Sequence, residues 1–204
     1  MKISVNDDDL MQMELRKRAH LINSVGGFKS VSLIGTTDNK GQTNLAIFSS
    51  IVHIGANPPL ISFIMRPDSV ERHTLSNILD TGFYTINHLN ESIYKQAHQT
   101  SARYPKDISE FDATGLNAEF KGNFIAPFVG ESNIQLGIEF KQRIDLTINN
   151  TIMIIGQIKE IHFPAECWEA DGYLDIEKAG SIACSGLDSY HNSNRLERLA
   201  YAKP

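Results

Sequence analysis

The chain has 204 residues, of which 41% are hydrophobic and 21% charged, a composition typical of a folded globular protein and not of a disordered one. The formal net charge at pH 7 is -5, which argues against nucleic acid as the main partner, because proteins that bind nucleic acid usually carry a basic face. An acidic protein can still bind a single phosphate group, since this requires only local donors.

The first predicted element is an amphipathic helix near the N-terminus. Its apolar residues recur at helical spacing: Met11, Leu15, Ala19, Ile22 and Val25. The aspartates at 7–9 are expected to cap its start, and Gly26-Gly27 to end it. We predict that residues 1–26 form a helical segment packed on a single domain that spans residues 1–204.

Strands and short helices are predicted over the next part of the chain. Four segments are rich in β-branched and apolar residues and are bounded by turn signals: 28–37, 42–48, 60–65 and 83–89. The first two are joined by Asp38-Asn39-Lys40-Gly41, and Arg66-Pro67-Asp68 ends the third. Two short helices are expected around 75–79 and over 91–99.

The clearest β signal is an alternation of apolar and polar side chains. Apolar residues occupy nearly every second position from 134 to 148, with an exception at Gln142. Asn149-Asn150 turns the chain, and residues 152–163 return as a second strand. Such alternation predicts one buried and one solvated face. Because hairpins of this kind build closed or nearly closed antiparallel barrels, we predict a mainly β barrel with peripheral helices.

Motifs for nucleotide triphosphates, dinucleotides, serine nucleophiles and metals are absent. The sequence has no GxxxxGK[ST] loop, GxGxxG fingerprint, GxSxG elbow or HExxH pair. The seven histidines are scattered, so no metal ligand is predicted. Any chemistry is therefore expected to depend on a cofactor.

The N-terminus and the cysteines indicate a reducing compartment. The first residues lack the apolar core of a signal peptide, and no apolar run approaches the length that crosses a bilayer. Cys167 and Cys184 are too few for a disulfide framework. We predict a cytoplasmic protein without a membrane partner.

The start of the helix predicted after residue 72 has features of an anion site. Thr74, with Asn77 three positions later, is expected to cap the helix, and Arg72 and His73 directly precede the cap. Arg66 ends the preceding strand. A helix N-terminus presents unpaired N–H groups, which suit a bound phosphate. Taken alone, the stretch is explained as simply by a capping threonine and solvated neighbours.

A set of motifs in a fixed order resembles a known family. The motifs are NLAIFSS at 44–50, NPPLISF at 57–63, RP at 66–67, RHTLSNI at 72–78 and TGFYTIN at 81–87. Together they resemble the first half of the flavin-reductase-like, FMN-binding split-barrel family. SGLDSYH at 185–191 and the last seven residues, 198–204, resemble a flavoredoxin-like bacterial branch of it. The resemblance implies an antiparallel split β-barrel that binds FMN.

The resemblance also implies which residues contact the cofactor. Nine cofactor-binding residues are implied: Asn44, Leu45 and Ala46 against the isoalloxazine ring, Ser49, Ser50 and Ile51 along the ribityl chain and phosphate, and Arg66, His73 and Thr74 at the phosphate. No catalytic side chain is implied, because the chemistry takes place at the flavin N5. The family is typically a homodimer with FMN near the subunit interface.

Four residues have no role assigned by the resemblance: Lys29, His53, Tyr190 and His191. Lys29 stands near the position where many members have an arginine, and we expect it to be solvated. The chain also has Ile47 where many members have proline. These departures leave the reductant and the acceptor open.

Three functions are compatible with this resemblance. The first is an oxidoreductase, an NAD(P)H-dependent flavin reductase that passes hydride or electrons through FMN. The second is a flavoredoxin-type electron carrier that retains its FMN and exchanges electrons with a protein redox partner. The third is a split barrel that binds haem, a deazaflavin or pyridoxal phosphate.

Overall fold

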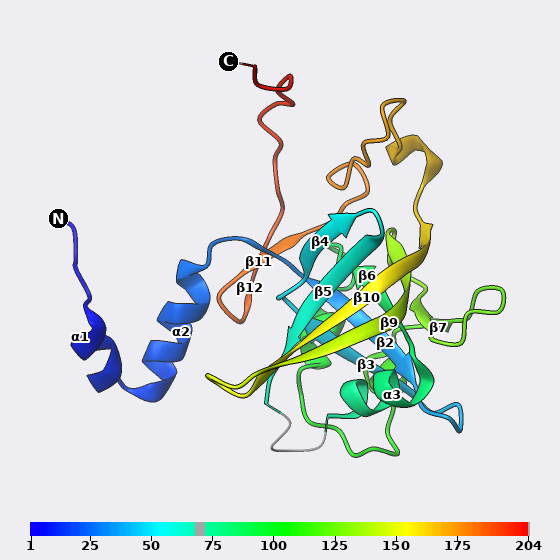
Figure 1. Cartoon of the computed structure of the whole chain (residues 1–204), viewed down its shortest axis with the longest axis horizontal. Helices are drawn as coiled ribbons and strands as arrows, with labels where there is room; N and C mark the ends of the chain where they lie inside the picture. Colours follow the sequence, from blue (N-terminus) through cyan, green and yellow to red (C-terminus); the bar gives the residue numbers. More distant parts are fainter. Residues whose placement is uncertain (68–71, 204) are drawn as a thin grey trace.

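The protein consists of a β-sheet body from which a helical arm and a C-terminal tail extend, as the computed structural model in Figure 1 shows. The structure describes residues 1–67 and 72–203. Asp68, expected to follow the end of a strand, therefore lies outside the described residues, as does Pro204. No helix among the described residues is long and apolar enough to cross a membrane.

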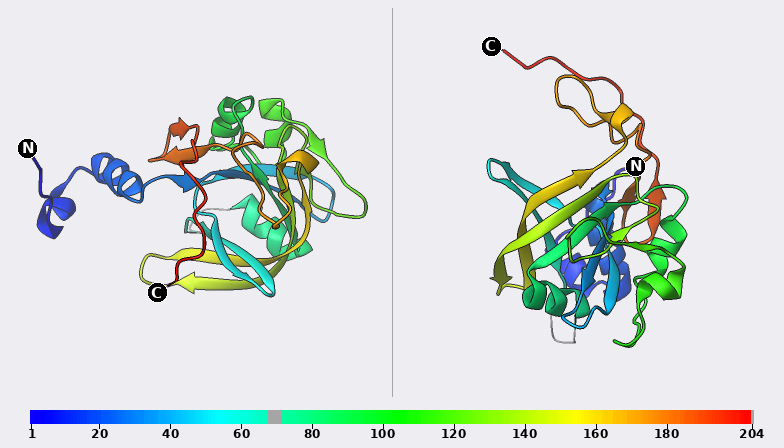
Figure 2. Two further views of the ribbon diagram at one scale, coloured as in Figure 1. Left: turned by 90° about the horizontal axis from the view of Figure 1, so that it is seen from above. Right: turned by 90° about the vertical axis from the view of Figure 1, so that its right-hand side faces the viewer.

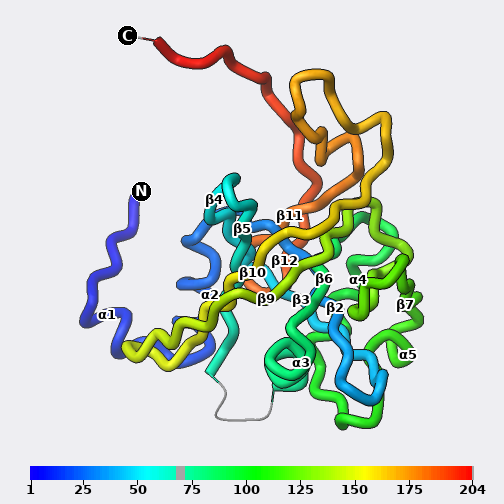
Figure 3. Tube along the Cα trace, turned by 45° about the vertical axis from the view of Figure 1, so that its right-hand side comes forward, coloured from blue at the N-terminus to red at the C-terminus, as the bar shows by residue number. Residues whose placement is uncertain are grey.

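The body is built on one seven-stranded sheet in which all neighbouring strands are antiparallel. In spatial order the strands are β3 (Thr43–Phe48), β2 (Ser32–Thr37), β6 (Phe83–His88), β9 (Gln135–Leu146), β10 (Thr151–His162), β5 (Pro59–Met65) and β4 (Val52–Ala56). The sheet is strongly curled, as the tube in Figure 3 shows. The predicted mainly β class is confirmed.

Among the described strands the sheet does not close into a barrel. β3 and β4 are the two edges of the sheet, and no ladder among the described strands joins them. Side chains hold the turn after β3 to β5 and β1. The Ser50 hydroxyl donates to the Ile64 carbonyl (3.0 Å) and accepts from its N–H (3.1 Å), and the Ser30 hydroxyl donates to the Ile51 carbonyl (3.2 Å). The sheet is split here because residues 49–51 turn the chain directly from one edge strand into the other.

Two smaller sheets and several short helices lie around the large sheet. The small sheets are β1 (Lys29–Ser30), β11 (Ala183–Ser185) and β12 (Ser189–His191) in one, and β7 (Ala118–Glu119) and β8 (Phe128–Val129) in the other. The helices of the body are α3 (His73–Thr81), α4 (Tyr94–Gln99), α5 (Glu110–Thr114) and the 3-10 helix η1 (Ala165–Cys167). α3 packs on β2 and β3, and α4 and α5 pack on β3.

Two apolar clusters form the core. The first lies inside the curled sheet around Phe63, Tyr84 and Ile138, and it includes Ile78 of α3. The second lies between β2, β3 and the helices α4 and α5, and it includes Leu45. One face of β3 therefore packs in the second apolar cluster, and the other face does not.

The hairpin of β9 and β10 confirms the strand pair that the alternation predicts, but only its inner half is buried. Both strands are 12 residues long and pair along their whole length, with two register shifts. Leu136 and Ile138 are buried, whereas Ile148 at the tip is 95% exposed. The outer half projects beyond the body, so apolar side chains at the tip have no core to enter within the chain.

Several elements differ from their sequence-based predictions. β4, α5, β11 and β12 are not predicted from the sequence, and the strand expected over 28–37 is interrupted at Val31, between β1 and β2. These elements have two to six residues, too few to show a periodicity.

The N-terminal segment forms two helices, not one. Asn6 caps α1 (Asp7–Gln12) through a reciprocal pair of hydrogen bonds with Asp9, both 3.0 Å long. The Glu14 carboxylate then accepts from the N–H groups of Arg16 and Lys17, each at 2.9 Å, and so begins α2 (Leu15–Val25). A second cap inside the expected helix divides it.

The packing of residues 1–26 on the body stays a prediction; at the end of α2 the Lys29 ammonium donates to the Asn23 carbonyl (3.3 Å), and Asn23 lines the cleft. No residue of α1 or α2 is buried, and the two helices extend away from the sheet in Figure 1 and in the left view of Figure 2. We call residues 1–26 the arm. Its apolar stripe is largely exposed, with Met11, Leu15 and Val25 each at least 68% exposed. The single-domain division of the chain stays a prediction.

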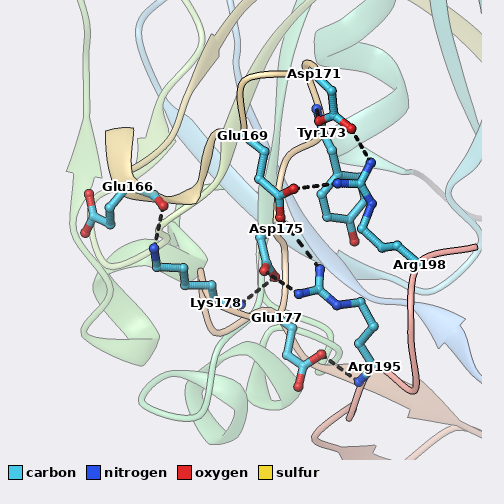
Figure 4. Close-up of polar contacts among 9 residues, drawn as sticks. All are labelled: Glu166, Glu169, Asp171, Tyr173, Asp175, Glu177, Lys178, Arg195 and Arg198. Atoms are coloured by element: carbon cyan, nitrogen blue, oxygen red, sulfur yellow. Dashed lines mark hydrogen bonds and ion pairs between the residues drawn. The ribbon is translucent and has the colours of Figure 1, made fainter.

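The C-terminal tail is extended and is held to the loop that follows β10. Arg198 forms ion pairs with Glu169 and Asp171 and lies over the Tyr173 ring, 4.1 Å from its centroid. Arg195 forms an ion pair with Asp175 at 3.2 Å. Figure 4 shows how these side chains converge. The tail is therefore held to the body by ion pairs and not by the burial of its side chains.

Candidate functional site

A cleft of about 880 Å³ opens beside the gap between the two edges of the sheet. It is lined by β3 and the turn after it, the end of β5, the start of α3, the loop after α4, and the small sheet of β11 and β12. Its volume lies in the range of pockets that hold a small molecule or cofactor. We call this space the cleft.

Seven of the nine residues implied by the sequence resemblance line the cleft: Asn44, Ala46, Ser49, Ser50, Arg66, His73 and Thr74. They come from three separate segments of the chain. The fold thus brings together at one cavity the stretches that the sequence analysis linked only by their order.

The other two implied residues, Leu45 and Ile51, do not line the cleft with the rest. The Leu45 side chain is fully buried in the second apolar cluster, because side chains alternate along a strand and its neighbours Asn44 and Ala46 take the cleft side. Ile51 packs against the first apolar cluster. A contact to a ligand in the cleft from Leu45 would have to come from its backbone.

The prediction that Thr74 caps α3 is wrong. The helix begins at His73, its N-cap is Arg72, and no side chain caps it. Thr74 is instead the second helical residue and is buried. Its hydroxyl accepts a hydrogen bond from the Asn44 amide, with 3.0 Å between Nδ2 and Oγ1. The threonine is thus part of a buried polar contact between α3 and β3.

This contact extends into a small network. The Asn44 amide also donates to the Thr36 hydroxyl (3.2 Å), which accepts a second bond from Asn77 of α3 (3.1 Å). The network connects α3 to both β2 and β3. Since both Asn44 bonds use Nδ2, its Oδ1 is the atom that can accept a hydrogen bond from a ligand.

The start of α3 offers donors to an anion. The first intrahelical bond runs from the Ser76 N–H to the Arg72 carbonyl (3.0 Å), so the N–H groups of residues 73–75 precede the hydrogen-bonded ladder. The side chains of Arg66, Arg72 and His73 line the same end of the cleft. The Arg72 side chain is oriented by a bond from Nε to the Pro67 carbonyl (3.3 Å). Helix N–H groups beside cationic side chains suit a phosphate.

Glu110, the first residue of α5, is a cleft residue that the sequence analysis missed. It is 7% exposed, and its Oε2 accepts a hydrogen bond from the Leu45 N–H at 2.9 Å. Burial raises the pKa of the Glu110 carboxyl, while the Leu45 N–H and the nearby His73 act in the opposite direction. In the sequence it is one acidic residue in a polar stretch, and only the packing of α5 on β3 places it at the cleft.

The opposite wall of the cleft contains Tyr190, whose role the sequence leaves open. The hydroxyl of Tyr190 lies 2.8 Å from Nδ1 of His98, and both residues line the cleft. Burial raises the pKa of Tyr190 to about 12. Cys184 also lies here, and burial raises the pKa of its thiol. The Tyr190 hydroxyl and the Cys184 thiol are therefore neutral hydrogen-bonding groups at neutral pH.

The other unassigned residues lie outside the cleft. Lys29 is not solvated as expected, because its ammonium donates to the carbonyl of Gly186 (2.8 Å) and so connects β1 to the loop between β11 and β12. His191 forms a hydrogen bond with Ser185 and packs edge-on against Phe28. His53 lies exposed on the edge strand β4.

The cleft has the groups that a mononucleotide cofactor needs and lacks those of a metal site. Hydrogen-bond donors lie at the start of α3. Small or apolar side chains line other parts of the cleft: Ala46, Ile47 and Met65. Within residues 1–67 and 72–203, no three His, Cys, Asp or Glu side chains are grouped so as to hold a metal ion. The residues present therefore fit a ligand with a phosphate at one end and a flat, mostly apolar body.

Comparisons with known proteins agree with this geometry. A family profile described as the flavin reductase like domain matches residues 25–176. A solved structure assigned as a flavin reductase with a split barrel domain, from Shewanella frigidimarina NCIMB 400, is 48% identical with a TM-score of 0.95, and the match covers 98% of this chain and all of that one. Flavoredoxin of Desulfovibrio vulgaris (Miyazaki F) has the same fold at 20% identity, with a TM-score of 0.74 over 86% of this chain and 92% of its own.

Among curated sequences, an uncharacterized protein of Aquifex aeolicus (strain VF5) is 27% identical over 108 residues, which is 52% of this chain. The chain spans 55% of the length of that relative. The family profile covers well over half of the chain, and the family that the motifs predict is confirmed. The chain belongs to the flavin reductase-like family.

Proposed function

We propose that the cleft binds FMN non-covalently and that the protein is a flavin-dependent oxidoreductase, reduced by NAD(P)H in the manner of a flavin reductase. The observation that carries the proposal is the convergence of Asn44, Ser49, Arg66 and His73 on one cleft. Bound FMN would supply the centre that accepts a hydride or electrons. Such a transfer depends on close and aligned rings more than on a general base, so no side chain is assigned a catalytic role.

Each end of the cleft has a separate task in this proposal. Arg66, His73 and the N–H groups at the start of α3 hold the phosphate, because charge and direction of the donors agree there. Asn44 is fixed by its bonds to Thr36 and Thr74, so its Oδ1 is oriented before a ligand arrives. A group oriented in advance lowers the entropy lost on binding.

A flavoredoxin-type electron carrier is the second candidate function. It is supported by the likeness of the fold to a flavoredoxin over most of both chains. In that case the protein would retain FMN and receive electrons from a protein redox partner. If a ferredoxin-type donor reduces the bound FMN rapidly while NAD(P)H is oxidised only slowly, the electron-carrier function is favoured over the flavin reductase.

The protein is also proposed to work in the cytoplasm as a homodimer, without nucleic acid or membrane partners. The arm exposes an apolar stripe, with Met11, Leu15 and Val25 each at least 68% exposed, and a second copy is the proposed cover. Asn23 of α2 lines the cleft, so a copy seated on the arm would lie beside the cofactor. Sedimentation equilibrium tests this: a dimer is expected, and a monomer at micromolar concentration would contradict it.

The absorption spectrum of freshly purified protein tests the proposed cofactor. A flavin spectrum, or quenching of flavin fluorescence as FMN is titrated in, is expected. Anaerobic NAD(P)H should then bleach the bound flavin. A colourless protein that ignores added FMN, or a spectrum of haem, deazaflavin or pyridoxal phosphate, would refute the assignment.

A further inference from the structure

Glu110 is a buried acidic residue placed between the edge strand and the cleft. α5 approaches β3 through two side-chain contacts, from Ser109 to Thr43 (2.7 Å between the hydroxyl oxygens) and from Glu110 to the Leu45 N–H (2.9 Å). The second contact covers an N–H that an edge strand would otherwise leave unpaired. A neutral glutamine could make the same bond, so covering the strand does not by itself require a carboxylic acid.

The surroundings of Glu110 make its charge sensitive to a ligand. The residue is 7% exposed and lines the cleft, so the carboxyl shares poorly solvated space with whatever the cleft binds. It is bonded to Leu45, which lies between Asn44 and Ala46, the two residues proposed to face the flavin ring. In such surroundings a charge added nearby acts strongly on a carboxyl group.

Besides a ligand, the charged groups around Glu110 come from the neighbouring elements and from three arginines that line the cleft, Arg66, Arg72 and Arg103. α5 packs against β3, which has no titratable side chain, and against α4, which carries Tyr94, Lys95 and His98. His98 is bonded to Tyr190 on the opposite wall. From α3, His73 is the group whose charge acts on Glu110.

We propose that Glu110 binds a second proton when the cofactor is reduced, and so couples reduction to proton uptake. The inference rests on the proposed function. FMN would gain two electrons and one proton, either as a hydride from NAD(P)H or as electrons from dithionite with a proton from solvent, and this would leave one additional negative charge in the cleft. The ionised Glu110 carboxylate then binds one proton from solvent and becomes a carboxylic acid, so that the net charge of the cleft is unchanged.

The test is the dependence of the FMN midpoint potential on pH, measured for the wild type and for Glu110→Gln. For a two-electron couple, each proton taken up changes the potential by about 30 mV per pH unit. Between the pKa values of Glu110 in the oxidised and the reduced protein, the wild-type slope should exceed that of the variant by about 30 mV per pH unit. Because the flavin and Glu110 act on each other's titration, the difference in slope counts the protons bound by the pair, and the infrared measurement below assigns the second proton to Glu110.

Glu119→Gln is the matched control, because it removes the same charge from an exposed residue of β7 outside the cleft. Its slope should equal that of the wild type. Equal slopes in all three proteins would overturn the inference while leaving FMN binding intact. Failure to bind FMN at all would refute the proposed function and the inference together.

An infrared measurement keeps the inference testable if Glu110→Gln does not fold. The reduced-minus-oxidised difference spectrum of the wild-type holoprotein should gain a C=O stretching band of a protonated carboxyl group. Glu110→Asp, which keeps an acid at this position, should shift that band, and Glu119→Gln should leave it in place. A wild-type spectrum without the band would overturn the inference.

Discussion

At the scale of single residues, the site is built from polar side chains that already form hydrogen bonds within the protein. Thr74 and Asn44 are buried and bonded to each other, and Ser50 is bonded to both backbone groups of Ile64. These residues shape the cleft before any ligand binds. Arg66 and His73, by contrast, keep side chains at the phosphate end that are available to an anion.

The phosphate end can be tested with Arg66→Gln. Loss of a charge-assisted hydrogen bond costs about 1.5–3 kcal/mol, so the FMN dissociation constant should rise about ten- to a hundredfold. Riboflavin, which has no phosphate, should bind as before. Fluorescence titration of both ligands measures the ratio.

Arg103→Gln serves as the control, since Arg103 lines the cleft from the loop after α4 and not from the start of α3. It should leave the preference for FMN over riboflavin unchanged. Equal losses of affinity for the two ligands in Arg66→Gln would remove the phosphate assignment.

His88 makes the stability of the protein depend on pH. Burial lowers the pKa of His88 from 6.5 to about 4, and its Nδ1 lies 2.9 Å from the Ser181 hydroxyl. Between pH 6.5 and 4 the unfolded chain therefore binds a proton that the folded chain does not. The free energy of unfolding should fall as the pH drops through this window.

Urea unfolding at a series of pH values measures this effect. His88→Gln should flatten the dependence between pH 6.5 and 4, whereas His53→Gln, on the exposed strand β4, should not. An unchanged profile in His88→Gln would show that other groups are responsible.

At the scale of elements, the tight contacts within the sheet limit what the strands can carry. Gly156 of β10 lies against β9 and β6, where a Cβ atom would meet Cγ2 of Ile138 at 2.3 Å and the Tyr84 hydroxyl at 2.4 Å. Both neighbours are fully buried. The glycine is needed at this position for space, in the middle of the strand that joins the two halves of the sheet.

Gly156→Ala should therefore be destabilising. Overpacking of a filled core costs about 1–3 kcal/mol, and thermal or denaturant unfolding should show a loss of this size. Gly26→Ala is the control, because a Cβ atom there meets nothing within 4 Å and the backbone is right-handed. A variant as stable as the wild type would mean that the sheet relaxes around the added methyl group.

At the scale of the whole molecule, the two termini extend from the body and are held to it differently. The arm has no buried residue, and its proposed cover is a second copy of the chain. The tail is held by Arg195 and Arg198 on an acidic loop (Figure 4). Because these ion pairs are exposed, we expect them to affect the position of the tail more than the stability of the fold.

Arg198→Gln should release the tail. Its ion pairs with Glu169 and Asp171 would be lost, and a carboxypeptidase should remove the last residues several-fold faster. Screening in 1 M salt, where the Debye length is about 3 Å, should have the same effect on the wild type. The unfolding midpoint should hardly move.

Arg16→Gln, a change of equal charge in the exposed arm, is the control and should leave digestion of the tail unchanged. Equal digestion of Arg198→Gln and the wild type would show that the arginine does not hold the tail.

Local patterns predicted much of the fold. The alternation from 134 to 148 predicts the β9–β10 hairpin, the turn at 38–41 predicts the β2–β3 hairpin, and apolar spacing predicts α3. These predictions hold because period and turn chemistry are properties of neighbouring residues. The motif stretches likewise contain half of the residues that line the cleft.

What the sequence by itself determined is therefore most strands of the large sheet, the order of the motifs and the family. Only the tertiary structure decided that the sheet stays open between β3 and β4, that Thr74 bonds Asn44 instead of capping α3, and that no residue of α1 or α2 is buried. It also placed Glu110 on Leu45, 65 positions earlier in the chain. The reason is physical: these outcomes depend on contacts between distant segments, whose burial and pairing no local pattern encodes.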